Sequence, residues 1–125
     1  MTKNLSQRLQ RIEQYFNDRI EQPILLRLAS RDLGMSPSTI QRTLRTGLGV
    51  GFHSALRRRR VELALKLLAE NQDLKIEAVA RSVGWKSRRT LYSAVQSVTG
   101  ATLSQHRVRP STDPQRPVFE GLPPG

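Results

Sequence analysis

Two short segments of the chain concentrate side chains that can form hydrogen bonds with the edges of nucleic-acid bases. In each segment, polar residues surround two apolar residues four positions apart, Ile40 with Leu44 and Leu91 with Val95. Arginine donates paired hydrogen bonds to guanine, and glutamine pairs with adenine in the same way. If each segment is a helix with its apolar residues inward, its outward residues are candidate DNA contacts. They are Ser38, Thr39, Gln41, Arg42, Arg45, Arg88, Arg89, Thr90 and Tyr92.

The distribution of charge indicates that these residues are more than the ordinary solvated faces of two helices. The chain of 125 residues has 21 Lys and Arg against 10 Asp and Glu, which gives a net charge of +11. No acidic residue lies between Asp32 and Glu62 or between Glu77 and Asp113, whereas solvated faces usually mix both signs. We therefore expect a polyanionic partner, and the charge alone leaves nucleic acid and an anionic membrane as alternatives.

A run of four arginines from Arg57 to Arg60 and a lysine beside the second segment add further positive charge. Four consecutive residues of a helix span about 300° of its surface, so at least one of these arginines must point inward. Basic side chains that contact phosphates hold DNA without distinguishing its sequence. The candidate phosphate contacts are Arg57, Arg58 and Lys86.

Helices must position these side chains, because apolar residues recur at steps of three and four along most of the chain. Ser36 and Ser87 are the predicted N-caps of the two polar segments, and Pro37 suits the first position of a helix. Gly49 and Gly100 are predicted to end these segments. The predicted helices cover about residues 5–21, 24–33, 37–48, 52–70, 76–83 and 88–99.

The chain contains an internal repeat, in which Ser30 and Gly34 correspond to Ala80 and Gly84 at an offset of 50 residues. The capped segments correspond at an offset of 51, so the second turn has one extra residue. A short helix, a Gly turn and a capped second helix form a helix-turn-helix, whose second helix enters the major groove of DNA. We predict an all-α protein of about seven helices with homeodomain-like helix-turn-helix subdomains at 1–50 and 72–109, a linker helix at 51–71 and a disordered Pro-rich tail at 110–125.

The sequence gives no sign of catalysis or of metal binding. The absence of Cys excludes disulfides and thiolate chemistry, and His53 and His106 are far apart with no paired carboxylate. A Gly-rich phosphate loop and a nucleophile with a nearby base are also absent. We therefore expect no enzymatic activity, no metal and no cofactor. Trp85 is expected to fill the space behind the second turn rather than to stack on a base.

Membrane binding is not favoured, because no segment of 18 apolar residues and no apolar signal-peptide core occurs. A basic amphipathic helix with Trp or Phe on its apolar face is also missing. We expect a cytoplasmic, nucleoid-associated protein. A helical protein-interaction module, or a nucleic-acid-binding module indifferent to sequence, is the alternative to specific DNA binding.

Two stretches give the sequence a family resemblance. The stretch RVELALKLL at 60–68 and the stretch IEAVARSVGW at 76–85 are similar to a linker helix and to an entry helix with its Gly-aromatic turn. Gly100 and Arg107 lie at the spacing of a closing motif. In these features the chain resembles the DNA-binding domain of the AraC/XylS family of bacterial transcription regulators, over about residues 5–109.

The resemblance implies roles for particular residues. Arg60 would point inward and form an ion pair across the linker helix. The chain departs from the family pattern at Ser93, where Arg is frequent, and smaller residues replace the usual Phe at Leu44, Leu91 and Val95. The base contacts that the resemblance implies are Ser38, Gln41, Arg42, Arg88, Arg89 and Thr90.

The predicted function is regulation of transcription by binding specific double-stranded DNA. A linker helix of 19 residues is about 28 Å long, close to the roughly 34 Å between successive major grooves on one face of DNA. We therefore expect one monomer to occupy two successive grooves without the palindromic site of a dimer. No effector-binding segment is evident, so we expect control by protein abundance or through RNA polymerase.

Overall fold

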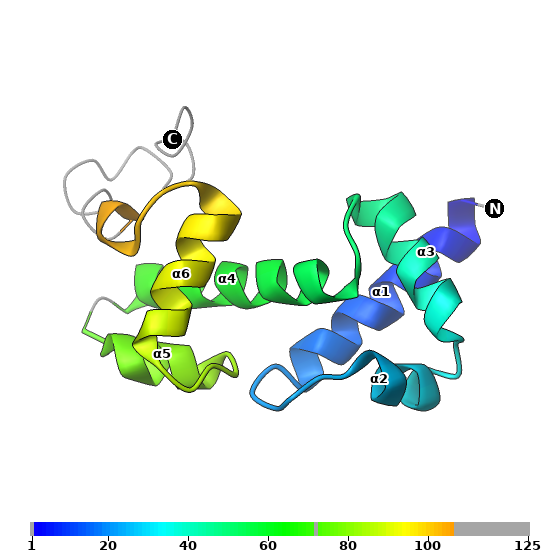
Figure 1. The fold of residues 1–125 in the computed structure, drawn as a ribbon, viewed down its shortest axis with the longest axis horizontal. Coiled ribbons are helices and arrows are strands. Elements are labelled where there is room, and N and C mark those ends of the chain that lie inside the picture. The colour runs from blue at the N-terminus through cyan, green and yellow to red at the C-terminus, as the bar shows by residue number, and fades with distance from the viewer. Residues whose placement is uncertain (1, 72, 107–125) are drawn as a thin grey trace. The chain divides into compact units, whose positions relative to one another are not determined.

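The computed structural model describes residues 2–71 and 73–106, and the elements in this part of the chain are helices joined by turns (Figure 1). This confirms the all-α prediction. A short helix at 103–106 follows six longer ones, which makes seven as expected, while the predicted tail at 110–125 lies outside the described residues. The six are α1 (Thr2–Asp18), α2 (Leu26–Leu33), α3 (Pro37–Leu48), α4 (Phe52–Glu70), α5 (Ile76–Ser82) and α6 (Arg88–Thr99).

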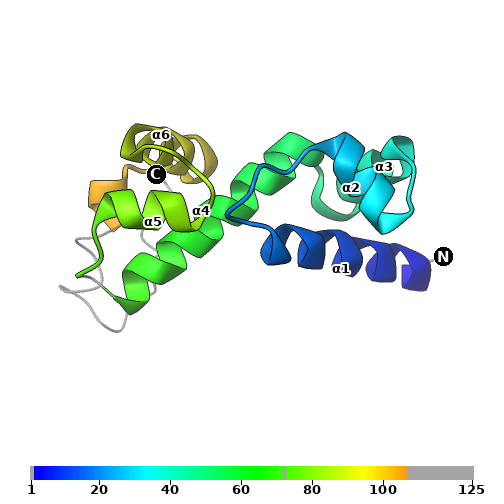
Figure 2. The same cartoon turned by 90° about the horizontal axis from the view of Figure 1, so that it is seen from below.

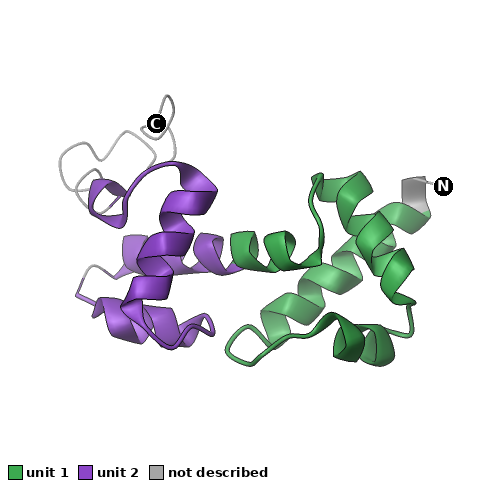
Figure 3. Ribbon diagram, in the orientation of Figure 1, with its two compact units in different colours: residues 1–59 green, residues 60–125 purple. Residues whose placement is uncertain are grey.

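The chain divides into two compact units, Met1–Arg59 and Arg60–Gly125 (Figure 3). The division falls inside α4, so the first turns of this helix belong to unit 1 and its later turns to unit 2. Unit 1 combines α1, α2 and α3 with the start of α4. None of the helices in the described part of the chain is both long and apolar enough to cross a membrane.

The predicted helix boundaries differ from the observed ones at the start of α1, which begins at Thr2 rather than at about residue 5, and at the connection between α1 and α2. α1 ends at Asp18, before the expected residue 21, because the chain turns there. The N–H of Arg19 bonds to the carbonyl of Phe16 at 3.2 Å, and the N–H of Gln22 bonds to that of Arg19 at 2.9 Å. Pro23 has no N–H to continue a helix, so α2 starts only at Leu26.

The core of unit 1 is formed by apolar side chains from all four of its helices. Ile12 and Phe16 of α1 are at most 1% exposed, and Ile40 and Leu44 of α3 are fully buried. Phe16 meets Phe52 of α4 edge to face, with ring centroids 5.4 Å apart. In the second view of the ribbon, α1 runs alongside α2 and α3, which it supports (Figure 2). This core therefore holds α3 against α1 and the start of α4.

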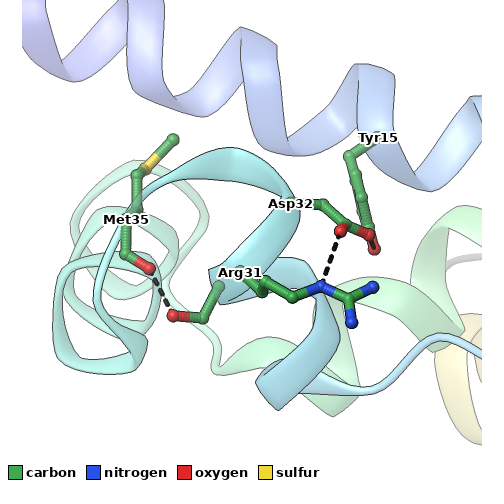
Figure 4. Close-up of polar contacts among 5 residues, drawn as sticks. Tyr15, Arg31, Asp32 and Met35 are labelled. Atoms are coloured by element: carbon green, nitrogen blue, oxygen red, sulfur yellow. Dashed lines mark hydrogen bonds and ion pairs between the residues drawn. The ribbon is translucent and has the colours of Figure 1, made fainter.

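A polar link also joins α1 to α2. The Tyr15 hydroxyl donates a 2.7 Å hydrogen bond to a carboxylate oxygen of Asp32, and Arg31 contacts the other oxygen at 3.1 Å (Figure 4). Burial and the bond to Asp32 raise the pKa of Tyr15. The guanidinium of Arg19 lies 4.2 Å from the centre of the Tyr15 ring. Arg11 of α1 donates to the Leu33 carbonyl at the end of α2, so the two helices are tied at two points.

The core of unit 2 brings together the later turns of α4, α5 and α6. Each contributes residues that are almost fully buried, such as Val61, Val79 and Leu91. Thr99 joins the end of α6 to the short helix that follows. Its hydroxyl donates to the Val95 carbonyl at 2.7 Å and lies 3.0 Å from a ring nitrogen of the buried His106. The histidine is therefore buried within unit 2, in contact with the end of α6.

The link between Tyr15 and Asp32 predicts a pH dependence of stability. The hydrogen bond from Tyr15, followed by that from Arg31, lowers the pKa of Asp32 below its ordinary 3.8. A carboxylate with a lower pKa in the folded state stabilises the fold above its unfolded pKa and loses this contribution as the pH falls through its folded pKa. Asp32→Asn should therefore lower the thermal midpoint near neutral pH, and this deficit should shrink below about pH 4.

Circular dichroism melts of both proteins across this pH range provide the measurement. Asp73→Asn, at an exposed carboxylate of unit 2, serves as the matched control and should change little at any pH. A deficit for Asp32→Asn that stays constant down to the lowest pH would rule out the carboxylate as its source.

Candidate nucleic-acid interface

The turn between α2 and α3 is held by backbone hydrogen bonds to one residue. The N–H groups of Gly34 and Met35 both donate to the carbonyl of Ser30, at 3.0 and 3.2 Å. Gly34 has a φ of +69°, a left-handed conformation that favours glycine. The Ser30 hydroxyl also donates to the carbonyl of Met35, which ties the turn to α2 (Figure 4). These bonds fix the direction in which α3 leaves the turn.

Unit 2 repeats this turn between α5 and α6. The N–H of Trp85 donates to the carbonyl of Ala80 at 2.8 Å, and Gly84 has a φ of +96°. Trp85 thus takes the place of Met35, 50 residues earlier, and Ala80 that of Ser30. The extra residue that the sequence predicted in the second turn is Lys86, which is exposed between Trp85 and the cap of α6.

Serine caps start both second helices, as predicted. The Ser36 hydroxyl oxygen accepts a hydrogen bond from the Thr39 N–H at 3.1 Å, and Pro37 occupies the first helical position of α3. The Ser87 hydroxyl accepts from the Thr90 N–H in the same way, at 3.3 Å. The hydroxyls of Thr39 and Thr90 also bond to those of the capping serines, so both threonines take part in the caps.

The candidate base contacts of α3 fall into two groups. Ser38, Arg42 and Arg45 are exposed on the side of the helix opposite to the buried Ile40 and Leu44. Thr39 and Gln41 are half-buried and already have partners. The side-chain oxygen of Gln41 accepts a 2.9 Å hydrogen bond from the N–H of Phe52. The structure thus brings three of the five α3 candidates together on one solvent-facing surface.

The candidates on α6 are all exposed. Arg88, Arg89 and Thr90 form its first turn, and Tyr92 is 41% exposed although it is aromatic. The opposite side of α6 buries Leu91, Ala94 and Val95. Each second helix therefore separates a buried apolar side from a solvent-facing side that carries arginine.

The arginine run has a graded exposure. Arg57 is exposed, whereas the next three arginines are half-buried, which agrees with the expectation that at least one points inward. Arg58 donates to the Leu48 carbonyl at 3.3 Å, and Nε of Arg59 donates to Asn17 of α1 at 2.6 Å. Burial lowers the pKa of Arg60, and its ion pair stays a prediction. Arg57 is thus the arginine of this run that is most available to a phosphate.

Two of these contacts were not expected from the sequence, the bond from Arg59 to Asn17 and the bond from Phe52 to Gln41. A signal for the second exists in the sequence, because Gly51 precedes α4 and has no side chain to cap it. The first joins residues 42 positions apart and has no local signal. Among the described residues, no cluster of His, Asp and Glu is suited to hold a metal ion.

Comparison with known proteins places this geometry in a family. A family model described as a helix-turn-helix domain, of AraC type, matches residues 29–109. The C-terminal domain of AraT, a response regulator from Geobacillus stearothermophilus, is similar in structure, with a TM-score of 0.70 and 27% identity over 80% of this chain and 83% of that one. The search of curated proteins found no match.

Two further structures share the fold. A DNA-binding transcriptional dual regulator from Escherichia coli K-12 has a TM-score of 0.71 and 24% identity, over 82% of this chain and 90% of that one. The DNA-binding domain of the global transcriptional factor AdpA, solved with a target DNA, has a TM-score of 0.71 and 21% identity, over 86% and 97%. The chain belongs to the AraC-type helix-turn-helix family of DNA-binding transcription regulators.

The serine caps predict a measurable loss of stability. Ser36→Ala and Ser87→Ala should each lower the free energy of unfolding by about 0.5–2 kcal/mol, because each leaves a helix N–H without its acceptor. Urea denaturation followed by circular dichroism measures both changes, and fluorescence of Trp85, the single tryptophan, reports on unit 2.

Ser38→Ala and Ser97→Ala are matched controls, since these exposed serines lie inside the same two helices. They should leave stability almost unchanged or raise it slightly, because alanine favours helix. Equal losses from capping and control serines would show that the caps contribute nothing particular.

Proposed function

We propose that the chain binds specific sequences of double-stranded DNA by inserting α3 and α6 into major grooves. The observation that carries the proposal is that both helices have the same arrangement, with a serine cap, a buried apolar side and exposed arginines opposite. A major groove is wide enough for one such helix and presents a distinct hydrogen-bonding pattern for each base pair. Two independent copies of this arrangement favour DNA binding over an accidental basic surface.

Base contacts and phosphate contacts fall to different residues in this proposal. The exposed side chains of the two second helices lie where base edges are contacted, whereas exposed basic residues outside them suit phosphates. Arg57 and Lys86 are phosphate contacts, and Arg58 joins them if it exchanges its bond to Leu48 for one to DNA. The proposed base contacts are the exposed Ser38, Arg42, Arg45, Arg88, Arg89, Thr90 and Tyr92, together with the half-buried Thr39. Gln41, expected from the sequence as a further base contact, has its side-chain oxygen bound by the Phe52 N–H and is not among them.

The length of α4 supports binding as a monomer. Its 19 residues correspond to about 28 Å, close to the roughly 34 Å that separates successive major grooves on one face of DNA. One chain would then occupy an asymmetric site of about two helical turns. The same proposal includes action in the cytoplasm, at the nucleoid, and control through contact with RNA polymerase.

Two arginine variants separate base contact from phosphate contact. Arg42→Ala should weaken binding to the specific site by about 1–3 kcal/mol and to random duplex much less. Arg57→Ala should weaken both alike and reduce the salt dependence of log K by about one unit of slope. Fluorescence-anisotropy titrations at several salt concentrations, on a duplex obtained by selection from random sequences, measure both effects.

Arg8→Ala is the matched control, because Arg8 is an exposed arginine of α1, outside the paired helices α2–α3 and α5–α6. It should have the smallest effect on either duplex. If Arg42→Ala costs the same on specific and random DNA, the protein binds nucleic acid without regard to sequence. Failure of the wild-type protein to bind any duplex would instead favour a protein-interaction module.

The number of protein chains bound to each selected duplex tests the proposal that the protein binds as a monomer. Sedimentation of the complex should show one protein per duplex, and footprinting should show an asymmetric protected region of about two turns. Two copies on a short palindrome would contradict this part of the proposal while leaving specific DNA binding intact.

A further inference from the structure

The residue that precedes α4 has no side chain to cap this helix. The N–H of Ala55 donates to the carbonyl of Gly51 at 2.9 Å, which makes Gly51 the N-cap. A glycine has no side chain that could accept from the free N–H groups of the first turn. One of these groups, that of Phe52, instead donates to the side-chain oxygen of Gln41 at 2.9 Å. The acceptor therefore comes from the middle of α3, 11 residues earlier in the chain.

The space around Gly51 is adapted to this arrangement. A Cβ atom at this position would lie 3.1 Å from the side-chain oxygen of Gln41 and 3.2 Å from a guanidinium nitrogen of Arg45, closer than most Cβ contacts. The φ of Gly51 is not positive, so its backbone does not require glycine. The missing side chain is therefore best explained by the room that Gln41 and Arg45 occupy beside the start of α4.

The corresponding place in unit 2 is built differently. Gln41 corresponds to Tyr92 at the repeat offset of 51, and Tyr92 is 41% exposed. The helix at 103–106 has its own cap, because the Thr102 N–H donates to the Gln105 side chain at 2.7 Å and the Gln105 N–H donates to the Thr102 hydroxyl at 3.3 Å. With a local cap present, α6 does not have to supply an acceptor from its solvent-facing side.

We infer that Gln41 is a positioning residue, which fixes α3 against the start of α4, and that it does not contact a base. At this position of the repeat, the base contact comes from Tyr92 alone. This role explains why Gln41 of α3 is half-buried and why its side-chain oxygen is bound to a backbone N–H. The statement that Gln41 does not contact a base rests on the proposed function. The statement that Gln41 fixes α3 against α4 concerns the protein without DNA.

Gln41→Ala tests the inference through stability and base preference together. Without DNA, the unfolding equilibrium constant should rise about fivefold, as is usual for loss of a helix cap. On DNA, binding to the selected duplex should weaken, yet the ranking of duplexes with single base-pair changes should stay the same. Tyr92→Ala, at the matched position of the repeat, should alter that ranking and leave stability nearly unchanged.

A second-site rescue distinguishes positioning from base contact. In Gln41→Ala the side chain of Gln41 no longer crowds residue 51, and the flexible end of the Arg45 side chain can move aside. Adding Gly51→Ser then supplies a hydroxyl acceptor at the N-cap itself. Stability and affinity for the selected duplex should both return toward wild-type values. A serine at position 51 cannot restore a lost contact to a base, because it acts only on α4.

Three results would overturn the inference. Gln41→Ala could leave stability unchanged, it could relax the preference at one base pair, or Gly51→Ser could fail to restore what Gln41→Ala lost. The denaturation measurements need no DNA and separate this inference from the proposed function. If the wild-type protein selects no duplex while the cap variants lose and regain stability as expected, only the proposed function fails.

Discussion

The burial of two side chains, one turn apart, on each second helix is the constraint on which the rest of the structure depends. Ile40 and Leu44 on α3, like Leu91 and Val95 on α6, are fully buried. Since helical residues are spaced about 100° apart, burying this pair leaves the opposite side of the helix in solvent. The surrounding helices supply the apolar surface that makes the burial favourable, and the glycine turns set the angle at which each second helix meets it.

This constraint explains how much could be predicted from the sequence. Apolar spacing identified the six longer helices, although not every end of them, and the inward sides of α3 and α6. The serine before each second helix identified its cap. The internal repeat placed both Gly turns correctly, including the extra residue before Ser87. These features are local, because each depends on residues within about one or two turns of one another.

The remainder depends on contacts between residues far apart in the chain. Tyr15 and Asp32 are 17 positions apart, and their hydrogen bond could not be inferred from either helix alone. The candidate site shows the same limit, because sequence pattern marked Gln41 as outward and polar but could not show that the start of α4 occupies its oxygen. The pattern gives the side of a helix on which a residue lies, and tertiary packing decides which of those residues have free hydrogen-bonding groups.

The different caps in the two units bear on how such a protein can acquire new DNA targets during evolution. The cap formed by Thr102 and Gln105 is self-contained, so the solvent-facing residues of α6 can change without disturbing the helix that follows. In unit 1 fewer positions of α3 can change without such an effect, since Gln41 also supports the start of α4. In the proposed mode of DNA binding, changes in base contacts should therefore accumulate faster in α6 than in α3.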